Sequence, residues 1–420
     1  MKKNNVKLTL LLIFLLFIGL ISINSCQKET VAEKTTNKSD HYFVNDLEAC
    51  NYSEKLFASN LLKSLKSASI DLSCSDDKKV KRITSITDKN KLTAMYVINY
   101  EQGGFAILSA DKRLVPILAY SSDNNLADSS VNRPPALESW LNYVKENIES
   151  VRSSNEAPTK EIQDEWRKLG NEENSYLKLK SANPDPGPCC TSSYEAHGPM
   201  LLTKWHQGCG FNSLLPQENF IPGCMNAMDC DRAAAGCVAI AMAQVMKFHQ
   251  RPTSYNWSLM PNKMPYSEPF PTEPAKLILA IDAKDALNPV YTCDKGTGST
   301  SSQAAYVLKN KFGYSSATYS SYNYTTVLSN LSHNKPVILS GGSGSDAHAW
   351  VCDGFRQSTG CTYDDFGNCI GASTSLYFHM NWGYDGNGDA WFAFNNFNPT
   401  IYGETNNFNS NVAMVYNITP

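Results

Sequence analysis

The sequence predicts an α+β protein in which a small N-terminal module precedes a larger module of helices followed by antiparallel strands. Apolar residues recur with helical spacing in four segments of the second half, which are 233–249, 273–287, 301–312 and 322–333. Strand-like apolar runs follow at 336–340, 348–355, 375–381 and 390–395. Helices that precede strands in one module favour two packed subdomains, one helical and one an antiparallel sheet, with a cleft between them.

The first residues are predicted to be an export signal and not part of the fold. Lys2 and Lys3 are followed by an almost unbroken apolar run over 8–23, and the run ends in Ser25-Cys26. This run is shorter than the roughly 20 residues that a membrane-spanning helix prefers. The pattern resembles a bacterial lipoprotein signal over residues 1–26 with Cys26 as the lipidated residue. An ordinary signal peptide with an incidental cysteine is the alternative. Residues 27–40 are polar and are predicted to form a tether.

Residues 41–152 are predicted to form a separate α+β module. A helix is expected within 51–67, two strands at 94–100 and 105–109 are joined by a Gly-rich turn, and a short strand follows at 115–120. Pro134-Pro135 then introduces a helix with apolar residues on one face. Residues 153–197 are polar and rich in proline, which predicts an exposed linker that proteases could cleave, with the cut expected at roughly 170–197.

Charge and cysteine content limit the classes of function. The net charge is −3 with 18% charged residues, so no basic excess indicates nucleic-acid binding.

Thirteen cysteines are consistent with export and disulfides. Three pairs of cysteines are candidates for disulfides. Cys361 with Cys369 and Cys224 with Cys230 each flank a short loop, and Cys50 with Cys74 lie together in the N-terminal region. Zinc is the weaker alternative because no CxxC pair occurs among the clustered cysteines, and no metal or cofactor is predicted. Asp385–Asp389 begins like a calcium loop but lacks its Gly and Glu, so a Gly-rich hairpin is favoured and calcium stays open.

Cys237 is the strongest candidate for chemistry. It follows the small residues 233–236 and begins an apolar helix, where free N–H groups and the helix dipole stabilise an anion. A lowered thiol pKa favours the thiolate, which is the nucleophilic form. A buried core cysteine is the alternative, since free cysteine is among the most buried residue types.

Three further segments supply partners for a nucleophilic thiol. His348 lies at the start of an apolar strand and could act as a base. Asn381 could accept a hydrogen bond from the histidine and Trp382 could shield that bond, while the Gln207 amide could donate to an oxyanion. His249 lies too far along the Cys237 helix to reach the thiol. His206 could line the cleft or be a packed residue, and neither reading is favoured. For His379 a packed structural role is favoured, with a supporting role in the site as the alternative.

In chain order these residues read Gln, Cys, His and Asn-Trp, and this order resembles the papain-like cysteine peptidases, in particular the streptopain group. The resemblance covers residues 198–420 and rests on Gly236-Cys237-Val238-Ala239, His348-Ala349 and Asn381-Trp382-Gly383. It implies a papain-like catalytic domain in which Cys237 is the nucleophile, His348 the general base and acid, Asn381 the residue that orients His348, Trp382 its shield and Gln207 an oxyanion donor. Tyr384 stands where Trp is frequent, and residues 356–374 are expected to be an insertion.

Residues 103–120 resemble the inhibitory prodomain of streptopain-like peptidases. The expected protein is a bacterial cysteine endopeptidase made as a zymogen, secreted or held by lipid at the outer membrane or cell surface of the envelope. Its expected partners are protein or peptide substrates, its own prodomain as an intramolecular inhibitor, and a membrane through Cys26, with no nucleic acid. A papain-like acyl transferase and a non-catalytic surface lipoprotein are the alternative functions.

Overall fold

The structure is a computed structural model. It describes eleven stretches of the chain, which are residues 41–57, 78–127, 133–154, 157–170, 193–217, 229–264, 272–292, 297–341, 347–363, 369–394 and 412–420. The predicted signal and tether therefore lie outside the described residues. No helix that the structure describes combines the length and the apolarity that are needed to cross a membrane.

The N-terminal module is a four-stranded antiparallel sheet with helices packed on it. Its elements are α2 (Asp46–Lys55), β1 (Val80–Thr87), β2 (Thr93–Tyr100), β3 (Phe105–Ser109), β4 (Ile117–Ser121), α4 (Pro135–Ser153) and α5 (Lys160–Leu169). Strands β2, β3 and β4 are almost wholly buried, and α4 places Leu137, Val144 and Ile148 in the same core. The hairpin and the helix after Pro134 are confirmed, whereas β1 was not predicted.

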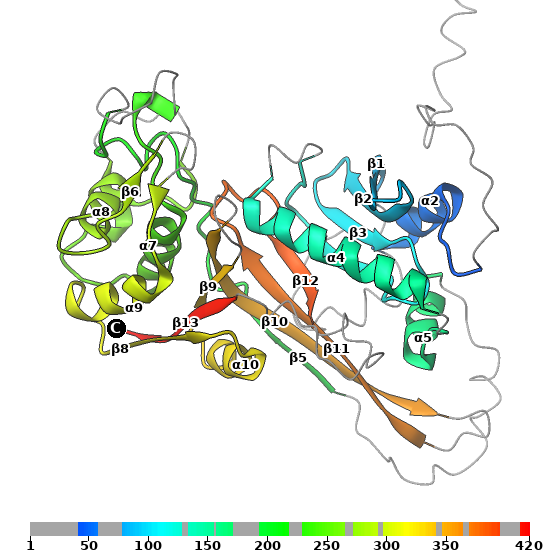
Figure 1. Ribbon diagram of the computed structural model, residues 1–420. Coiled ribbons are helices and arrows are strands. Elements are labelled where there is room, and N and C mark those ends of the chain that lie inside the picture. The colour runs from blue at the N-terminus through cyan, green and yellow to red at the C-terminus, as the bar shows by residue number, and fades with distance from the viewer. Residues whose placement is uncertain are drawn as a thin grey trace, which may run out of the picture.

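The C-terminal module has a helical part and a sheet. Its helices are α7 (Cys237–His249), α8 (Glu273–Ile281), α9 (Ser301–Asn310) and α10 (Tyr324–Ser332), with the short 3-10 turns η4 (Asp229–Asp231) and η5 (Trp257–Leu259). The strands are β5 (Ser193–His197), β8 (Ser316–Ser321), β9 (Val337–Gly341), β10 (His348–Tyr363), β11 (Cys369–Asn381), β12 (Ala390–Phe394) and β13 (Ala413–Thr419), and β6 (Val290–Tyr291) pairs with β7 (Thr297–Gly298). Helix α7 packs between the other helices and strand β10, so the first turn of the helix faces the sheet (Figure 1).

The two modules share one continuous sheet. The strand order is β1-β2-β3-β4-β12-β11-β10-β9-β13-β8, and β5 pairs with β10 outside this path. The junction is the antiparallel pair β4–β12, in which Tyr120 lies opposite Trp391 and Ala119 opposite Phe392. Figure 1 shows α4 crossing this sheet beside β12. The N-terminal module therefore extends the sheet of the C-terminal module by strand addition, which the sequence did not predict.

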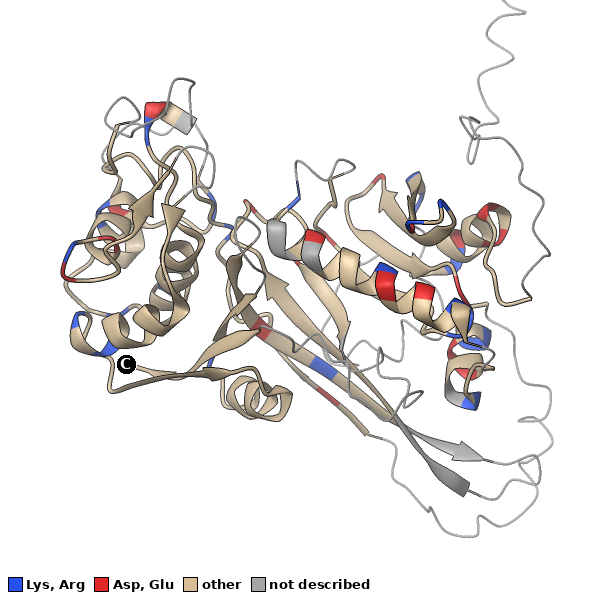
Figure 2. Ribbon diagram, in the orientation of Figure 1, with Lys and Arg blue, Asp and Glu red and all other residues tan. Residues whose placement is uncertain are grey.

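The predicted linker over 153–197 is only partly a linker. Helix α5 is amphipathic, buries Trp166 and Leu169, and places Glu165 against Ser375 of β11 with Oγ to Oε1 at 2.7 Å. At the other end, residues 193–197 form β5 and pair with β10. Both ends are therefore regular structure and not linker, and α5 is partly buried, whereas the residues of β5 are exposed or half-buried as predicted. Residues 171–192 lie outside the described residues. Figure 2 shows charges of both signs along α4 and α5 and few on α7 and the central strands.

The predicted insertion over 356–374 is the outer part of the long β10–β11 hairpin. The register pairs Cys361 with Ala372 and Cys369 with Tyr363, so the two cysteines are not directly opposite each other. Their side chains lie outside the described residues, and the Cys361–Cys369 disulfide stays a prediction.

Candidate active site

Cys237 is the first residue of α7, and its environment stabilises a thiolate. Gly236 is the N-cap, and a Cβ at this position would lie 3.0 Å from the Thr297 carbonyl oxygen, so a side chain there would be in tight contact with strand β7. Burial opposes the charge on sulfur, but the His348 ring and its hydrogen bond, with the N–H groups of Ala349 and Val238, outweigh burial. The pKa of the Cys237 thiol is therefore lowered. The side chain remains half-buried and so stays accessible.

His348 is the first residue of β10 and is 5% exposed. Its Nε2–H donates to the Trp382 carbonyl oxygen at 2.9 Å, which leaves Nδ1 for the bond to the Cys237 thiol. Burial works against the charged ring, but the Cys237 thiolate and the Trp382 carbonyl outweigh it and raise the pKa of His348. Opposite shifts in two hydrogen-bonded groups favour a thiolate–imidazolium pair.

The group that orients His348 is not the one predicted. The Asn381 side chain donates from Nδ2 to the Thr203 carbonyl at 2.7 Å and accepts from Gly383 N–H at 3.2 Å and Gln244 Nε2 at 3.0 Å. Among these described contacts none reaches His348. The direct Asn381–His348 bond was therefore a wrong prediction, because the neighbouring backbone carbonyl of Trp382 takes the ring nitrogen. A backbone acceptor carries no side-chain pattern that a sequence could reveal.

The Trp382 side chain is 1% exposed and contributes mainly to the core beneath the site. Its indole Nε1–H donates to the Gly388 carbonyl at 2.9 Å, and its ring packs on Trp350 and Phe392, each at 5.3 Å between centroids. The ring that lies against His348 is Tyr384, with centroids 6.1 Å apart. Trp382 therefore does not shield the predicted Asn381–His348 bond, since that bond is not formed.

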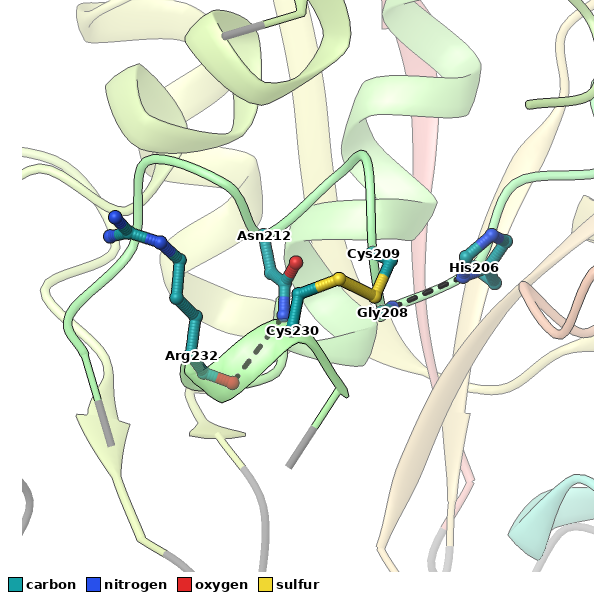
Figure 3. The surroundings of a disulfide bond; sticks show 6 residues. All are labelled: His206, Gly208, Cys209, Asn212, Cys230 and Arg232. Atoms are coloured by element: carbon teal, nitrogen blue, oxygen red, sulfur yellow. Dashed lines mark hydrogen bonds between the residues drawn. A yellow bond between two sulfur atoms is a disulfide. The ribbon is translucent and has the colours of Figure 1, made fainter. Parts of the chain in front are cut away.

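The loop that carries Gln207 is fixed close to the nucleophile. The Gln207 carbonyl accepts from Ala235 N–H at 2.8 Å, two residues before Cys237, and the Gln207 side chain is half-buried. The neighbouring His206 Nδ1 accepts from Gly208 N–H at 3.1 Å, so His206 shapes this turn (Figure 3). A disulfide joins Cys209 to Cys230 and ties the loop to η4 (Figure 3). The pairing of Cys224 with Cys230 was thus a wrong prediction, because Cys209 is the spatial neighbour of Cys230.

A second buried histidine lies on β11 behind the site. His379 Nδ1–H donates to Asp353 Oδ1 at 2.6 Å, and Asp353 also accepts from Leu201 N–H at 2.9 Å through Oδ2. Next to this pair, Asp389 Oδ1 accepts from the Trp382 N–H at 2.8 Å. Burial raises the pKa of the Asp389 carboxyl to about 7 against the opposing effects of the Trp382 N–H and His379. Sequence reasoning missed Asp353 and considered Asp389 only as part of a possible calcium loop. An aspartate inside an apolar strand such as Trp350–Phe355 is itself an indication of a buried polar network.

The loop after Trp382 also contacts the N-terminal module. Asn124 donates from Nδ2 to the Asp389 carbonyl at 2.8 Å and accepts from Lys204 Nζ at 2.7 Å. Gly388 N–H donates to the Asn125 carbonyl at 3.2 Å, and Arg356 Nη1 donates to the Tyr120 hydroxyl at 2.7 Å. The N-terminal module therefore touches the elements that hold His348.

The Asp385–Asp389 segment forms a tight turn with positive φ at Asp385, Gly386 and Gly388. Its carboxylates have protein partners, since Asp385 pairs with Lys263 at 3.1 Å and Asp389 accepts from Trp382 N–H. Among the described residues no group of three His, Cys, Asp or Glu side chains could hold a metal ion.

A papain-like two-subdomain fold, a thiol at a helix N-terminus, an imidazole on the facing sheet and an attached N-terminal module together define a cysteine peptidase with a prodomain. The model of the Peptidase C10 family matches residues 205–254 and 251–392, and the model of the Spi protease inhibitor matches residues 34–148. The C-terminal module is therefore similar to the Peptidase C10 family, and the N-terminal module is similar to the Spi protease inhibitor.

Known proteins agree with this assignment. The chain is 26% identical to streptopain of Streptococcus pyogenes serotype M1 over 373 residues, which cover 78% of this chain and 81% of streptopain. It is 24% identical to the thiol protease/hemagglutinin PrtT of Porphyromonas gingivalis over 340 residues, which cover 72% of this chain and 34% of PrtT. The solved structure of a prointerpain A fragment from Prevotella intermedia matches with a TM-score of 0.53 at 22% identity, covering 81% of this chain and 99% of that one. The prediction of a cysteine peptidase is confirmed.

Proposed function

We propose that the protein is the zymogen of an exported cysteine endopeptidase in which Cys237 and His348 perform the chemistry. The observation that carries this proposal is the hydrogen-bonded Cys237–His348 pair, in which the thiol pKa is lowered and the imidazole pKa is raised. Such a pair is a nucleophile and a proton donor in contact, which acyl transfer from a peptide requires.

The reaction follows from these groups. The Cys237 thiolate adds to the scissile carbonyl carbon, and the carbonyl oxygen becomes an oxyanion. The Cys237 N–H and the Gln207 amide are the proposed donors to that oxyanion, each contributing about 3–4 kcal/mol in comparable sites. The His348 imidazolium gives its proton to the leaving amine, and the C–N bond breaks to leave a thioester. Water then attacks the thioester with His348 as base, which releases the acid and restores the thiolate.

We further propose that residues 41–152 with helix α5 inhibit the enzyme until the chain is cut between α5 and β5. Asn124 and Asn125 bind the turn that follows Trp382, and β4 completes the edge of β12. Strand β5 is paired with β10, so a cut beyond residue 192 would remove a strand from the catalytic sheet. The processing site is therefore expected within residues 171–192.

The test of the catalytic pair is the Cys237→Ala variant. It is expected to fold, to remain uncut and to lack peptidase activity, since alanine is well tolerated at a helix start. Cys352→Ala is the matched control, because Cys352 is the second free thiol within the described part of the chain and is completely buried with a raised pKa. Mass, melting temperature and peptide hydrolysis are measured for both variants from a protease-deficient host. A Cys237→Ala variant that still hydrolyses peptides would refute this assignment, and one that matures unaided would refute self-processing.

We also propose that Cys26 carries lipid and holds the protein at the cell envelope. The support is the apolar run that ends in Ser25-Cys26 and the polar residues 27–40 after it. Cys26→Ser is expected to move the protein from the detergent phase to the aqueous phase when expressed in a host with lipoprotein processing. Unchanged partitioning into detergent would contradict the lipid anchor.

A further inference from the structure

Gln244 is a completely buried amide on the same helix as the nucleophile. It lies seven residues, or about two turns, after Cys237, and with Ile240 it forms the face of α7 that packs against Gly383. A Cβ on Gly383 would lie 3.1 Å from Ile240 Cγ2 and 3.9 Å from Gln244 Nε2. Gln244 is completely buried. Burying an amide costs free energy unless its polar atoms form hydrogen bonds, so the partners of the Gln244 amide are important.

Backbone groups fix the orientation of two linked amides at this point. Asn381 Oδ1 faces the Gly383 N–H and Asn381 Nδ2 faces the Thr203 carbonyl, so the Asn381 carboxamide can adopt only one orientation. Gln244 must then present its Nε2 to Asn381 Oδ1, at 3.0 Å, and its Oε1 lies 3.4 Å from the Trp205 N–H. Both amides are thereby held by groups whose donor or acceptor character is certain.

The same peptide unit contacts both Asn381 and His348. The Gly383 N–H and the Trp382 carbonyl belong to one planar peptide. Asn381 holds the N–H side of that plane, and the carbonyl side accepts from His348 Nε2 at 2.9 Å. A fixed plane aims the carbonyl at the imidazole and helps to raise the pKa of His348, whose thiolate partner begins the helix that carries Gln244.

We propose that Gln244 is a positioning residue that sets the orientation of His348 relative to Cys237 through Asn381 and the Trp382–Gly383 peptide. This inference rests on the proposed roles of Cys237 and His348. Hydrogen bonds from Gln244 to Asn381 and from Gly383 to Asn381 connect the helix that carries Cys237 to the peptide that orients His348. Loss of the Gln244 donor leaves Asn381 Oδ1 with one donor and allows the peptide plane to tilt.

The first test is Gln244→Met, which keeps the size of the side chain and removes both polar atoms. We expect kcat to fall about tenfold to a hundredfold with KM nearly unchanged, because a misplacement of about 1 Å can cost that much. The alkylation of Cys237 by iodoacetamide is expected to begin at higher pH, since a loosened His348 stabilises the thiolate less. Each variant is matured with immobilised wild-type peptidase that is then removed, so failed self-processing does not hide the result.

Gln244→Glu separates hydrogen bonding from space filling. A protonated carboxyl can donate to Asn381 Oδ1, whereas a carboxylate cannot and repels that oxygen. The activity of this variant relative to wild type is therefore expected to fall as the pH rises, with no such trend for Gln244→Met. The Met246→Ala variant, at a buried apolar position of the same helix, is the control for packing alone and is expected to melt at lower temperature with normal kcat.

A double-mutant cycle with Asn381→Ala completes the test. Gln244→Met is expected to cost little in the Asn381→Ala background, because the path is already broken. Full additivity, or wild-type kcat and alkylation profile in Gln244→Met, would overturn the inference. These results differ from failure of the proposed function, which would appear as an active Cys237→Ala variant. If Gln244→Met does not fold, the pH trend of Gln244→Glu decides the question.

Discussion

His348 and His379 lie on neighbouring strands, both are almost completely buried, and the pKa of each is raised, yet their surroundings differ. His348 contacts a half-exposed thiol and one backbone carbonyl, while His379 contacts the fully buried carboxylate of Asp353. A histidine whose partner can react is arranged for chemistry, whereas one whose partner is a fixed buried anion stabilises the fold. Burial and a shifted pKa alone do not distinguish the two, and the accessibility of the partner does.

Replacing each histidine with alanine is the sharpest test of this comparison. His348→Ala is expected to reduce turnover by about 10²–10⁴-fold or more, because a general acid and base is lost. It should change the free energy of unfolding little. His379→Ala is expected to lower that free energy by about 3–5 kcal/mol, since it leaves a buried Asp353 carboxylate with a missing partner.

Urea unfolding and single-substrate kinetics measure both quantities for each variant. The comparison fails if His379→Ala abolishes turnover in a protein of normal stability. It also fails if His348→Ala unfolds the chain and leaves turnover intact in the folded fraction.

Features that depend on local sequence patterns could be predicted, whereas those that depend on contacts distant in sequence could not. The thiol at a helix start, the histidine at a strand start and the order of helices and strands are local patterns, and the structure confirms the fold class that they indicate. Strands β8 and β13 were missed because they pair with each other across about a hundred residues of sequence, and β8 is rich in serine and not an apolar run. The acceptor for His348 was predicted to be the Asn381 side chain and is the Trp382 carbonyl. Every residue has a backbone carbonyl, so the sequence does not indicate which one accepts.

The junction between the two modules was also beyond sequence reasoning. The pairing of β4 with β12 joins segments more than 250 residues apart. The sequence of neither strand indicates which other strand it pairs with. The interface adds Arg356, which lies over the Trp391 ring at 4.0 Å and donates to Tyr120. Because the partner strand removes an edge from each sheet, the inhibitor module stabilises the catalytic sheet as well as contacting the site.

The smallest expected effect concerns Asp389, which lies beside the His379–Asp353 pair and holds the N–H of Trp382. Its pKa is raised to about 7, so the folded protein holds a proton there that the unfolded chain releases near pH 4. The sign follows by linkage: the stability associated with this proton is present below about pH 4 and is lost as the pH rises through about 7. His379, Asp353 and Lys204 are the charged groups that contribute to the shift.

Asp389→Asn should remove this pH dependence, because the amide oxygen can still accept from the Trp382 N–H and carries no charge. We expect the variant to be more stable than wild type at pH 8, on the order of 1–2 kcal/mol, with a smaller or no gain at pH 4. The raised pKa of His379 also makes stability fall as the pH rises, so the difference between the two proteins, and not either curve alone, reports on Asp389. Thermal melting from pH 4 to 8 measures it. A difference in stability that stays constant from pH 4 to 8 would show that the Asp389 carboxyl does not titrate in that range. The pH dependence of this buried cluster would then come from the His379–Asp353 pair alone.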